Sequence, residues 1–407
     1  MVLTNFTSTL EMQEHTRKER RFDETERDLP GRTSKVASTS GAKETLYGLL
    51  SYLGPRNPLR RSITADDTVW LLDNTAYRDA STGRWQAEYV AAIFSQHSSC
   101  AVVDAAGAVA KKLELAEHDP AYETLQERVF PFLQDIKPAT QLKALYDGKT
   151  PISLGPSGAN GISNNTKVLP ASDDGHIVAT SAKVPKGANG ILEMKTVFAD
   201  VEGWGIISDI DDTIKVTQTG DPIGILKSTF IDEPNPIAGM PELYKHIYSL
   251  VRETSAWFYL SASPYNLYPF LREFRENYYP HGTIILRDSS WMSIQGLLTT
   301  LTLGTEEYKV DRMEKIHSWL PRRKMIFIGD STQTDPEAYG EIYRRYPEWV
   351  KAILIRKVED IAAIGIEKKN EPERFEKAFR DVPPTVWHIF TDPETCRKVI
   401  EDAVTKE

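Results

Sequence analysis

The sequence has few cysteines, no long apolar run and no excess of basic residues, and each of these absences excludes a class of protein. Among its 407 residues only Cys100 and Cys396 are cysteines, too few for a disulfide framework and consistent with a reducing compartment. Neither has an arginine six positions later, because Ala106 and Asp402 stand there, so a phosphate-binding loop built on a cysteine nucleophile is absent. No apolar run is long enough to cross a bilayer, and we expect no secretory signal at the polar N-terminus.

The balance of charge bears on the partners of the chain. A formal net charge of -9 at pH 7 argues against a general nucleic-acid binder, so we expect no nucleic-acid partner. An anionic substrate stays open, because a local basic pocket matters more than the total charge. With 40% hydrophobic and 26% charged residues, the composition is ordinary for a soluble globular protein, and the length allows two domains. Together with the low cysteine count, this leads us to expect a cytoplasmic location.

The chain divides into four segments by composition and pattern. Residues 1–40 are charged and poor in large apolar groups, and we expect them to be disordered. Residues 41–200 predict a mostly β domain with a helical insert, and residues 201–365 predict an α/β domain. Residues 366–407 are expected to form a helical tail, with Val386–Phe390 docked on a domain surface.

Short alternating runs and turn residues characterise the first domain. A helix is expected at 44–53, a strand at 68–74 and a helix at 122–133, followed by hairpins over 150–200. The Gly-rich stretch 154–163 lacks the Gly-Lys-Ser/Thr ending of a phosphate-binding loop, which favours a loop between strands.

In the second domain, continuous apolar strands alternate with helices, which predicts a three-layer fold with a parallel sheet covered on both faces. The expected strands are 204–208, 256–260, 283–286, 325–328 and 351–355, and the expected helices are 241–252, 267–277, 310–320 and 337–346. Ligands of such sheets bind at the carboxyl ends of the strands, so polar residues at those ends are the candidates for a site.

Two candidate positions follow the first two of these strands. Asp209 and Asp211 are two residues apart in an extended segment and so point to the same side, where one could attack phosphorus and the other act as general acid and base. The alternative is an acidic helix N-cap with Asp211 and Asp212 in the first turn. Ser261 could bind a phosphoryl oxygen, or it could belong to a turn and cap with Ser263.

Two further candidates lie later in the chain. Lys309 could supply positive charge to an anionic transition state, with Lys315 as a rival on the same segment. Asp330 and Asp335 lie on a strand-end loop and suit Mg²⁺, which prefers oxygen ligands. The alternative is a helix N-cap at Asp335, with a proline at the first helical position.

The order of these motifs resembles the haloacid dehalogenase superfamily of phosphatases, through DIDDT, LSAS, YKVDRMEKI and GDSTQTD. Within it, GWGIISDIDDTIKVT, WFYLSASPYNLYPFLREF and FIGDSTQTDPEAYG resemble the fungal actin-patch phosphatidate phosphatase family. The resemblance is strong over residues 203–356. It extends loosely to TVWLLDNTAYR and LGPSGANGIS.

The resemblance implies a role for each matching residue. Asp209 would be the nucleophile that forms an aspartyl-phosphate, and Asp211 would protonate the leaving alkoxide and later activate water. Lys309 would stabilise the phosphoryl group, and its spacing before Pro321 fits the family better than that of Lys315. Thr213 and Ser261 would bind the substrate phosphoryl group. Asp330 would bind Mg²⁺ together with Asp209 and the carbonyl of Asp211, supported by Asp335.

The implied reaction is hydrolysis of phosphatidate to diacylglycerol and phosphate at a membrane surface. The same chemistry on a soluble phosphomonoester and a non-catalytic actin-patch adaptor are the alternatives. The apolar segments 224–231 and 291–303 could contact acyl chains, or could simply pack on the sheet.

A proline motif lies near the start of the first domain. Pro55–Arg60 (PRNPLR) fits a PxxP core with a basic residue, which Src-homology-3 domains bind in the polyproline conformation. A basic edge that meets anionic lipid is the alternative. The resemblance further implies cortical actin-patch partners and a peripheral membrane location.

Overall fold

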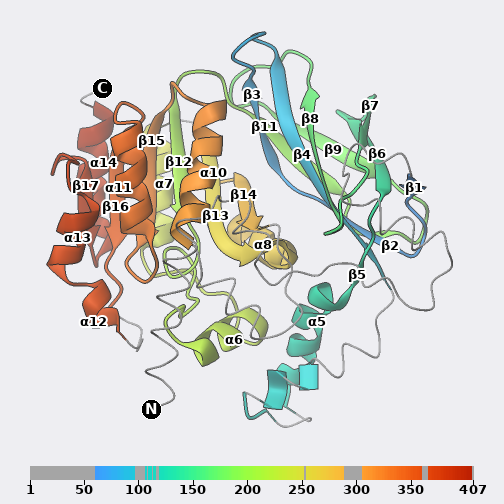
Figure 1. Ribbon diagram of the computed structural model, residues 1–407, viewed down its shortest axis with the longest axis horizontal. Helices are drawn as coiled ribbons and strands as arrows, with labels where there is room; N and C mark the ends of the chain where they lie inside the picture. The colour runs from blue at the N-terminus through green and yellow to red at the C-terminus, as the bar shows by residue number, and fades with distance from the viewer. Residues whose placement is uncertain are drawn as a thin grey trace.

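The computed structural model describes residues 60–96, 106–107, 109–111, 113–115, 119–251, 254–287, 305–359 and 365–405. Residues 1–40, the helix expected at 44–53, all of the proline motif except Arg60, and the apolar segment 291–303 lie outside these ranges. Figure 1 shows an α/β part on the left and a β-rich part on the right. No described helix combines the length and apolar character that a bilayer span requires.

The α/β part contains a six-stranded sheet in which every neighbouring pair is parallel. Its order is β14-β13-β12-β15-β16-β17. The bounds are β12 (Trp204–Asp209), β13 (Ala256–Pro264), β14 (Thr283–Arg287), β15 (Lys324–Asp330), β16 (Val350–Arg356) and β17 (Trp387–Phe390). The five predicted strands are confirmed.

The sixth strand corrects the prediction of a helical tail. β17 pairs in parallel with β16, from Ile353↔Trp387 to Arg356↔Phe390. The tail does contain α12 (Ile366–Lys369), α13 (Pro372–Ala378) and α14 (Cys396–Thr405). The segment 386–390, expected to dock on a domain surface, does so as an edge strand, and the sequence did not predict this strand because four residues carry too little periodicity to recognise.

Helices cover both faces of this sheet and make it the middle of three layers (Figure 1). One face packs against α7 (Met240–Val251), α8 (Tyr268–Tyr278) and α14, and the other against α10 (Thr305–Trp319), α11 (Asp335–Arg345) and α13. Successive strand residues alternate between the two cores, as Ile206 and Ile207 show. Because both faces are buried, the strands read as continuous apolar runs.

The strand order places a switch point between β12 and β15. From β12 the chain moves outward to β13 and β14, then returns to β15 on the other side of β12 and moves outward again. Crevices for ligands form at such a point, beyond the carboxyl ends of the strands. Asp209 ends β12 and Asp330 ends β15. The short helix α6 (Pro222–Phe230) lies beneath the sheet in Figure 1.

The β-rich part is an eleven-stranded sheet with the helix α5 (Ala121–Leu133), as predicted for this region. Its strands are β1 (Arg61–Ser62), β2 (Asp67–Leu71), β3 (Asn74–Arg78), β4 (Trp85–Ser95), β5 (Asp135–Ile136), β6 (Thr140–Tyr146), β7 (Thr150–Leu154), β8 (Ile162–Val168), β9 (Ile177–Lys183), β10 (Asn189–Ile191) and β11 (Glu193–Phe198). The single strand expected at 68–74 is two strands, because the extended pairing is interrupted between Leu71, which ends β2, and Asn74, which begins β3. The Gly-rich stretch connects β7 to β8, as expected of a loop between strands.

Ion pairs join the two parts, buried at Asp73 and half-buried at Glu88. Asp73 lies between β2 and β3, and its carboxylate accepts hydrogen bonds from Arg275 and Arg272 of α8. Lys315 of α10 forms an ion pair at 2.7 Å with Glu88 of β4. Lys315, the rival of Lys309 in the sequence, therefore belongs to this interface.

Candidate active site

A carboxylate and a lysine lie at the end of the central strand. β12 pairs with β13 on one side and with β15 on the other, and its last residue, Asp209, pairs with Leu260 of β13, which holds it at the switch point. Asp209 is 1% exposed. Lys309 reaches it from α10, with Nζ 2.7 Å from Asp209 Oδ1, and also forms an ion pair with Asp335. The structure thus brings Asp209 and Lys309 together, as the sequence predicts.

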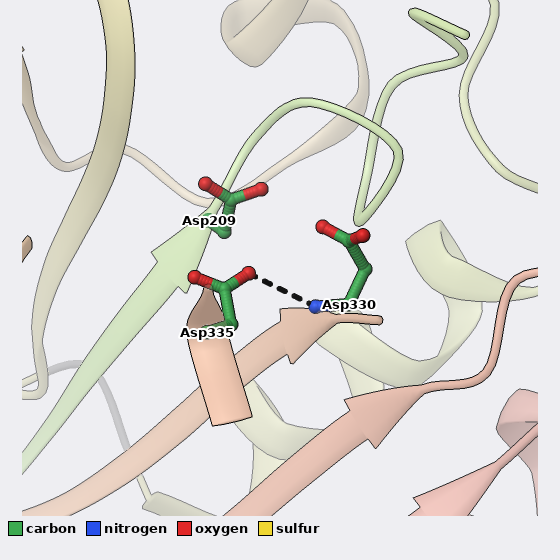
Figure 2. Close-up of side chains that lie close together, drawn as sticks. All are labelled: Asp209, Asp330 and Asp335. Atoms are coloured by element: carbon green, nitrogen blue, oxygen red, sulfur yellow. Dashed lines mark hydrogen bonds between the residues drawn. The ribbon is translucent and has the colours of Figure 1, made fainter. Parts of the chain in front are cut away.

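Figure 2 shows Asp330 and Asp335 beside Asp209. Asp330 N donates to Asp335 Oδ2 over 3.0 Å, and one oxygen from each of the three carboxylates lies within 4.8 Å of the others. Gly329 permits this approach, since a Cβ there would lie 2.6 Å from Asp335 Oδ2. Thr213 Oγ1 is 3.1 Å from both Asp209 Oδ2 and Asp330 Oδ2. Five of the predicted residues therefore converge on one buried cluster: Asp209, Thr213, Lys309, Asp330 and Asp335.

The carboxylate of Asp211 lies beside this cluster and not within it. It accepts hydrogen bonds from three hydroxyls: Ser261 at 2.6 Å, Ser263 at 3.2 Å and Thr217 at 2.8 Å. Three donors on two oxygens fix the orientation of the carboxylate. Ser261 and Ser263 end β13, so the interpretation of this segment as a plain turn and cap is wrong, because β13 runs through Pro264.

Sequence reasoning missed the loop that follows. Asp212 has a φ of 59°, and its carboxylate accepts backbone N–H groups from Thr217, Gln218 and Thr219 at 2.6–2.9 Å. Lys215 is 2% exposed and donates to Thr217 Oγ1 over 3.0 Å. These contacts correct the alternative of an acidic helix N-cap, because the residues wrap into a loop that leads to α6. The third aspartate of DIDDT, Asp212, was the signal in the sequence that could have predicted this loop.

The buried charges favour a bound cation. Burial raises the pKa of Asp209 well above its ordinary value; Lys309 opposes this shift, and the charges of Asp335 and Asp330 add to it. Burial and Asp335 raise the pKa of Asp330 to about 6. Burial opposes the charge of Lys309, but Asp209 and Asp335 raise its pKa. Three carboxylates against one lysine leave an excess of negative charge, and their oxygen donors suit a hard divalent ion.

Fold and site together define a doubly wound α/β protein with an acidic site at its switch point. Residues 204–357 match the family model described as phosphatidate phosphatase APP1, catalytic domain, so this domain belongs to that family, as the sequence predicts. All the candidate residues lie within the match.

Two fungal relatives align with the chain. It is 31% identical over 176 residues to phosphatidate phosphatase APP1 of Saccharomyces cerevisiae, covering 42% of this chain and 29% of that protein. It is 29% identical over 164 residues to an uncharacterized protein of Schizosaccharomyces pombe, covering 39% of this chain and 26% of that protein. The chain thus spans less than a third of either relative.

Proposed function

We propose that this chain is a Mg²⁺-dependent phosphatidate phosphatase that works through an aspartyl-phosphate. The observation that carries the proposal is the pairing of Asp209 with Lys309 at 2.7 Å, beside Asp330 and Asp335, within a domain of the APP1 catalytic family. The similarity to a named phosphatidate phosphatase favours the lipid substrate. The carboxylates alone do not choose among phosphomonoesters, because many substrates share such a site.

The residues support a two-step displacement. Asp209 attacks phosphorus while the bond to the glycerol oxygen breaks, and Asp211 gives its proton to that oxygen. Asp211 then takes a proton from water, which attacks the aspartyl-phosphate and releases inorganic phosphate and Asp209. Lys309 offsets the charge of the phosphoryl oxygens. Mg²⁺, when bound by Asp209, Asp330 and Asp335, would supply further positive charge to the phosphoryl group.

The hydroxyls proposed to bind substrate are engaged with carboxylates. Ser261 donates to Asp211, and Thr213 lies between Asp209 and Asp330. To bind a phosphoryl oxygen, each hydroxyl exchanges its carboxylate acceptor for the substrate. The exchange keeps the hydrogen bond of the hydroxyl but takes one donor from a buried carboxylate, and Asp211 then retains Ser263 and Thr217 as donors.

The first segment proposed for acyl contact, 224–231, falls largely on α6. Its residues Leu226 and Phe230 are 2% and 0% exposed, and Phe230 packs edge-on against Phe132 of α5 with ring centroids 5.7 Å apart. Ile223 is 50% exposed. Of the segment 224–231 proposed for acyl contact, these two apolar residues are therefore core residues, and Ile223 just before it is the apolar side chain of α6 that faces outward.

Phosphate release tests the chemistry. We expect wild-type protein to hydrolyse phosphatidate in mixed micelles with Mg²⁺, and to lose activity with a chelator. Asp209→Asn should reduce turnover by about 10³-fold or more, because an amide is a poor nucleophile. Substantial turnover by the Asn variant would sink the assignment of Asp209.

Surface dilution tests the substrate. At fixed bulk phosphatidate, the rate should fall as inert detergent is added, and kcat/KM should exceed that for glycerol 3-phosphate. Each acyl methylene buried contributes about 0.8 kcal/mol. Equal efficiency on both substrates would favour a soluble phosphomonoester. Absence of turnover on either would favour the adaptor role.

A further inference from the structure

The segment between two of the clustered carboxylates controls their geometry. Residues 331–334, which we call the acidic loop, connect Asp330 at the end of β15 to Asp335 at the start of α11. Figure 2 shows these two carboxylates facing Asp209. Because the loop is short, a rotation of one of its peptide units would move Asp330 relative to Asp335. The backbone of this loop therefore needs firm support.

Arg374 of α13 supplies such support with all five of its N–H donors. Two groups donate to carbonyl oxygens of the acidic loop: Nη1 to Ser331 over 2.6 Å, and Nη2 to Gln333. Nη1 also donates to the carbonyl of Lys369 over 2.8 Å. Nε and Nη2 donate to the carboxylate of Glu337 in α11, over 2.8 and 2.9 Å. A guanidinium is rigid and planar, so these contacts fix the two carbonyls relative to α11.

The contact between Arg374 and the carbonyl of Ser331 is connected to the carboxylate of Asp330 through a single peptide unit. The carbonyl of Ser331 and the N–H of Thr332 belong to the same planar group and point in opposite directions. Arg374 binds the carbonyl side, while the N–H and the hydroxyl of Thr332 donate to Asp330 Oδ1. The arginine thus holds the orientation of the group that orients Asp330.

Neighbouring residues of the tail reinforce the same loop. Lys369 Nζ donates to the carbonyl of Thr332. Asn370 donates to the carbonyl of Val358 over 2.7 Å, and Val358 N donates to Ser331 Oγ over 3.0 Å. Three consecutive carbonyls of the acidic loop are therefore held from the segment 369–374. This segment lies outside residues 204–357, which match the catalytic-domain family.

We propose that Arg374 is a positioning residue that holds Asp330 and Asp335 in the arrangement that binds the divalent cation. The proposal rests on the function proposed above, since it presumes that this cluster is the cation site. The competing explanation is that Arg374 only attaches the tail to the domain. That explanation predicts a loss of stability but no specific loss of cation affinity.

The test compares two arginine variants of the full chain. Arg374→Met keeps the aliphatic stem and removes every donor. Arg345→Met is the matched control: Arg345 lies on α11 and forms ion pairs with Glu314 and Glu341, but the structure records no contact between it and the acidic loop. Mg²⁺ affinity is measured by calorimetry on folded protein, without substrate. Loss of a group that orients a metal ligand weakens affinity by about 10- to 100-fold, and we expect about 10-fold for Arg374→Met and no change for Arg345→Met.

Two further measurements separate positioning from attachment. Excess Mg²⁺ should restore kcat of Arg374→Met, and its KM for phosphatidate at saturating Mg²⁺ should equal that of the wild type. Arg374→Lys keeps the charge near Glu337, but a single ammonium cannot span both loop carbonyls, so its Mg²⁺ affinity should also fall. This second variant keeps the test decisive if Arg374→Met folds poorly.

The outcomes separate the two proposals. Weakened Mg²⁺ binding by both Arg374 variants, with an unchanged control, supports the positioning role. Wild-type affinity in either folded Arg374 variant overturns it and leaves the proposed function standing. Wild-type protein that binds no Mg²⁺ would refute the cation site itself, and the positioning role with it.

Discussion

The buried carboxylate of Asp73 provides a quantitative test of how the β-rich part is joined to the α/β part. Asp73 Oδ2 accepts from Arg275 Nη2 over 3.0 Å and from Arg272 Nε over 3.2 Å, and Oδ1 accepts from Lys195 N over 2.9 Å. The side chains of Asp73 and Arg275 are 1% and 2% exposed. Asp73→Asn keeps the shape and an acceptor but removes the charge, so it isolates the electrostatic contribution.

The loss of unfolding free energy expected for Asp73→Asn depends on the charge of Arg275, which stays buried in the variant. Removing one charge of a buried pair costs about 3–5 kcal/mol, because the other charge is left without compensation. In the variant, Arg275 still donates to the carbonyl of Gly282 and keeps an ion pair at 3.3 Å with Glu276, whose side chain is 41% exposed and therefore compensates the charge only weakly. Arg272 is less buried and keeps Glu276 as a partner. Since asparagine can still accept one hydrogen bond, we expect the lower end, about 3 kcal/mol.

The pH dependence has a definite sign. Burial alone would raise the pKa of Asp73, but Arg275 and Arg272, with other contacts, hold it below the ordinary value. The stability from this carboxylate is therefore present above its unfolded pKa of about 4, and is lost as the pH falls through the folded pKa. The deficit of Asp73→Asn should be full at neutral pH and shrink in acid.

Urea unfolding at neutral pH, followed by tryptophan fluorescence, measures the effect. Asp200→Asn is the control, because Asp200 pairs with Arg78 at 35% exposure of each side chain and should cost less than about 1 kcal/mol. Combining Asp73→Asn with Arg275→Met should cost less than the sum of the single losses, since no buried charge is then unpaired. A deficit for Asp73→Asn no larger than that of the control would refute the reasoning.

Two other predictions concern the stability of the fold and the role of α6. Burial and Arg275 lower the pKa of His281 to about 4. Below about pH 6.5 the unfolded chain therefore binds more protons at this histidine than the folded chain does. The free energy of unfolding should fall as the pH falls, by about 2 kcal/mol between neutral pH and pH 5. Urea midpoints of His281→Gln should show a correspondingly weaker pH dependence, and an identical slope would contradict this. Ile223→Asp should lower turnover of micellar phosphatidate while sparing a soluble chromogenic ester, because Ile223 is 50% exposed. Leu226→Asp should instead lower the free energy of unfolding by about 3 kcal/mol or more, because Leu226 is 2% exposed; equal unfolding midpoints would show that Leu226 is not a core residue.

Patterns within short segments of the sequence were enough to predict several residues of the candidate site. The run Trp204–Ile207 is apolar and is followed by the polar Ser208, which identifies a buried strand, and Asp209 lies at the end of that strand. The same reasoning places Asp330 after β15 and Asp335 at the start of α11, where Pro336 marks the first turn. The rule that ligands bind at strand ends then gathers these residues on one edge.

Other features depend on contacts between segments far apart in the chain. Asp211 and Ser261 are 50 residues apart, and their hydrogen bond exists because β12 and β13 are neighbours in a particular register. Lys309 and Lys315 lie on the same helix, and only the packing of α10 directs one to Asp209 and the other to Glu88. The edge strand β17 is likewise recognisable by its pairing with β16, not by its four residues.

The sequence by itself determined the order of strands and helices along the chain, the mostly β region before them, and the aspartates at the strand ends, because hydrophobic periodicity and turn residues act over a few neighbouring positions. Only the tertiary structure decided the order β14-β13-β12-β15-β16-β17, the hydroxyls around Asp211 and the support of the acidic loop by Arg374. These depend on which segments pack together and in which register. Periodicity within a segment shows which face is buried, but it does not specify the partner that covers it.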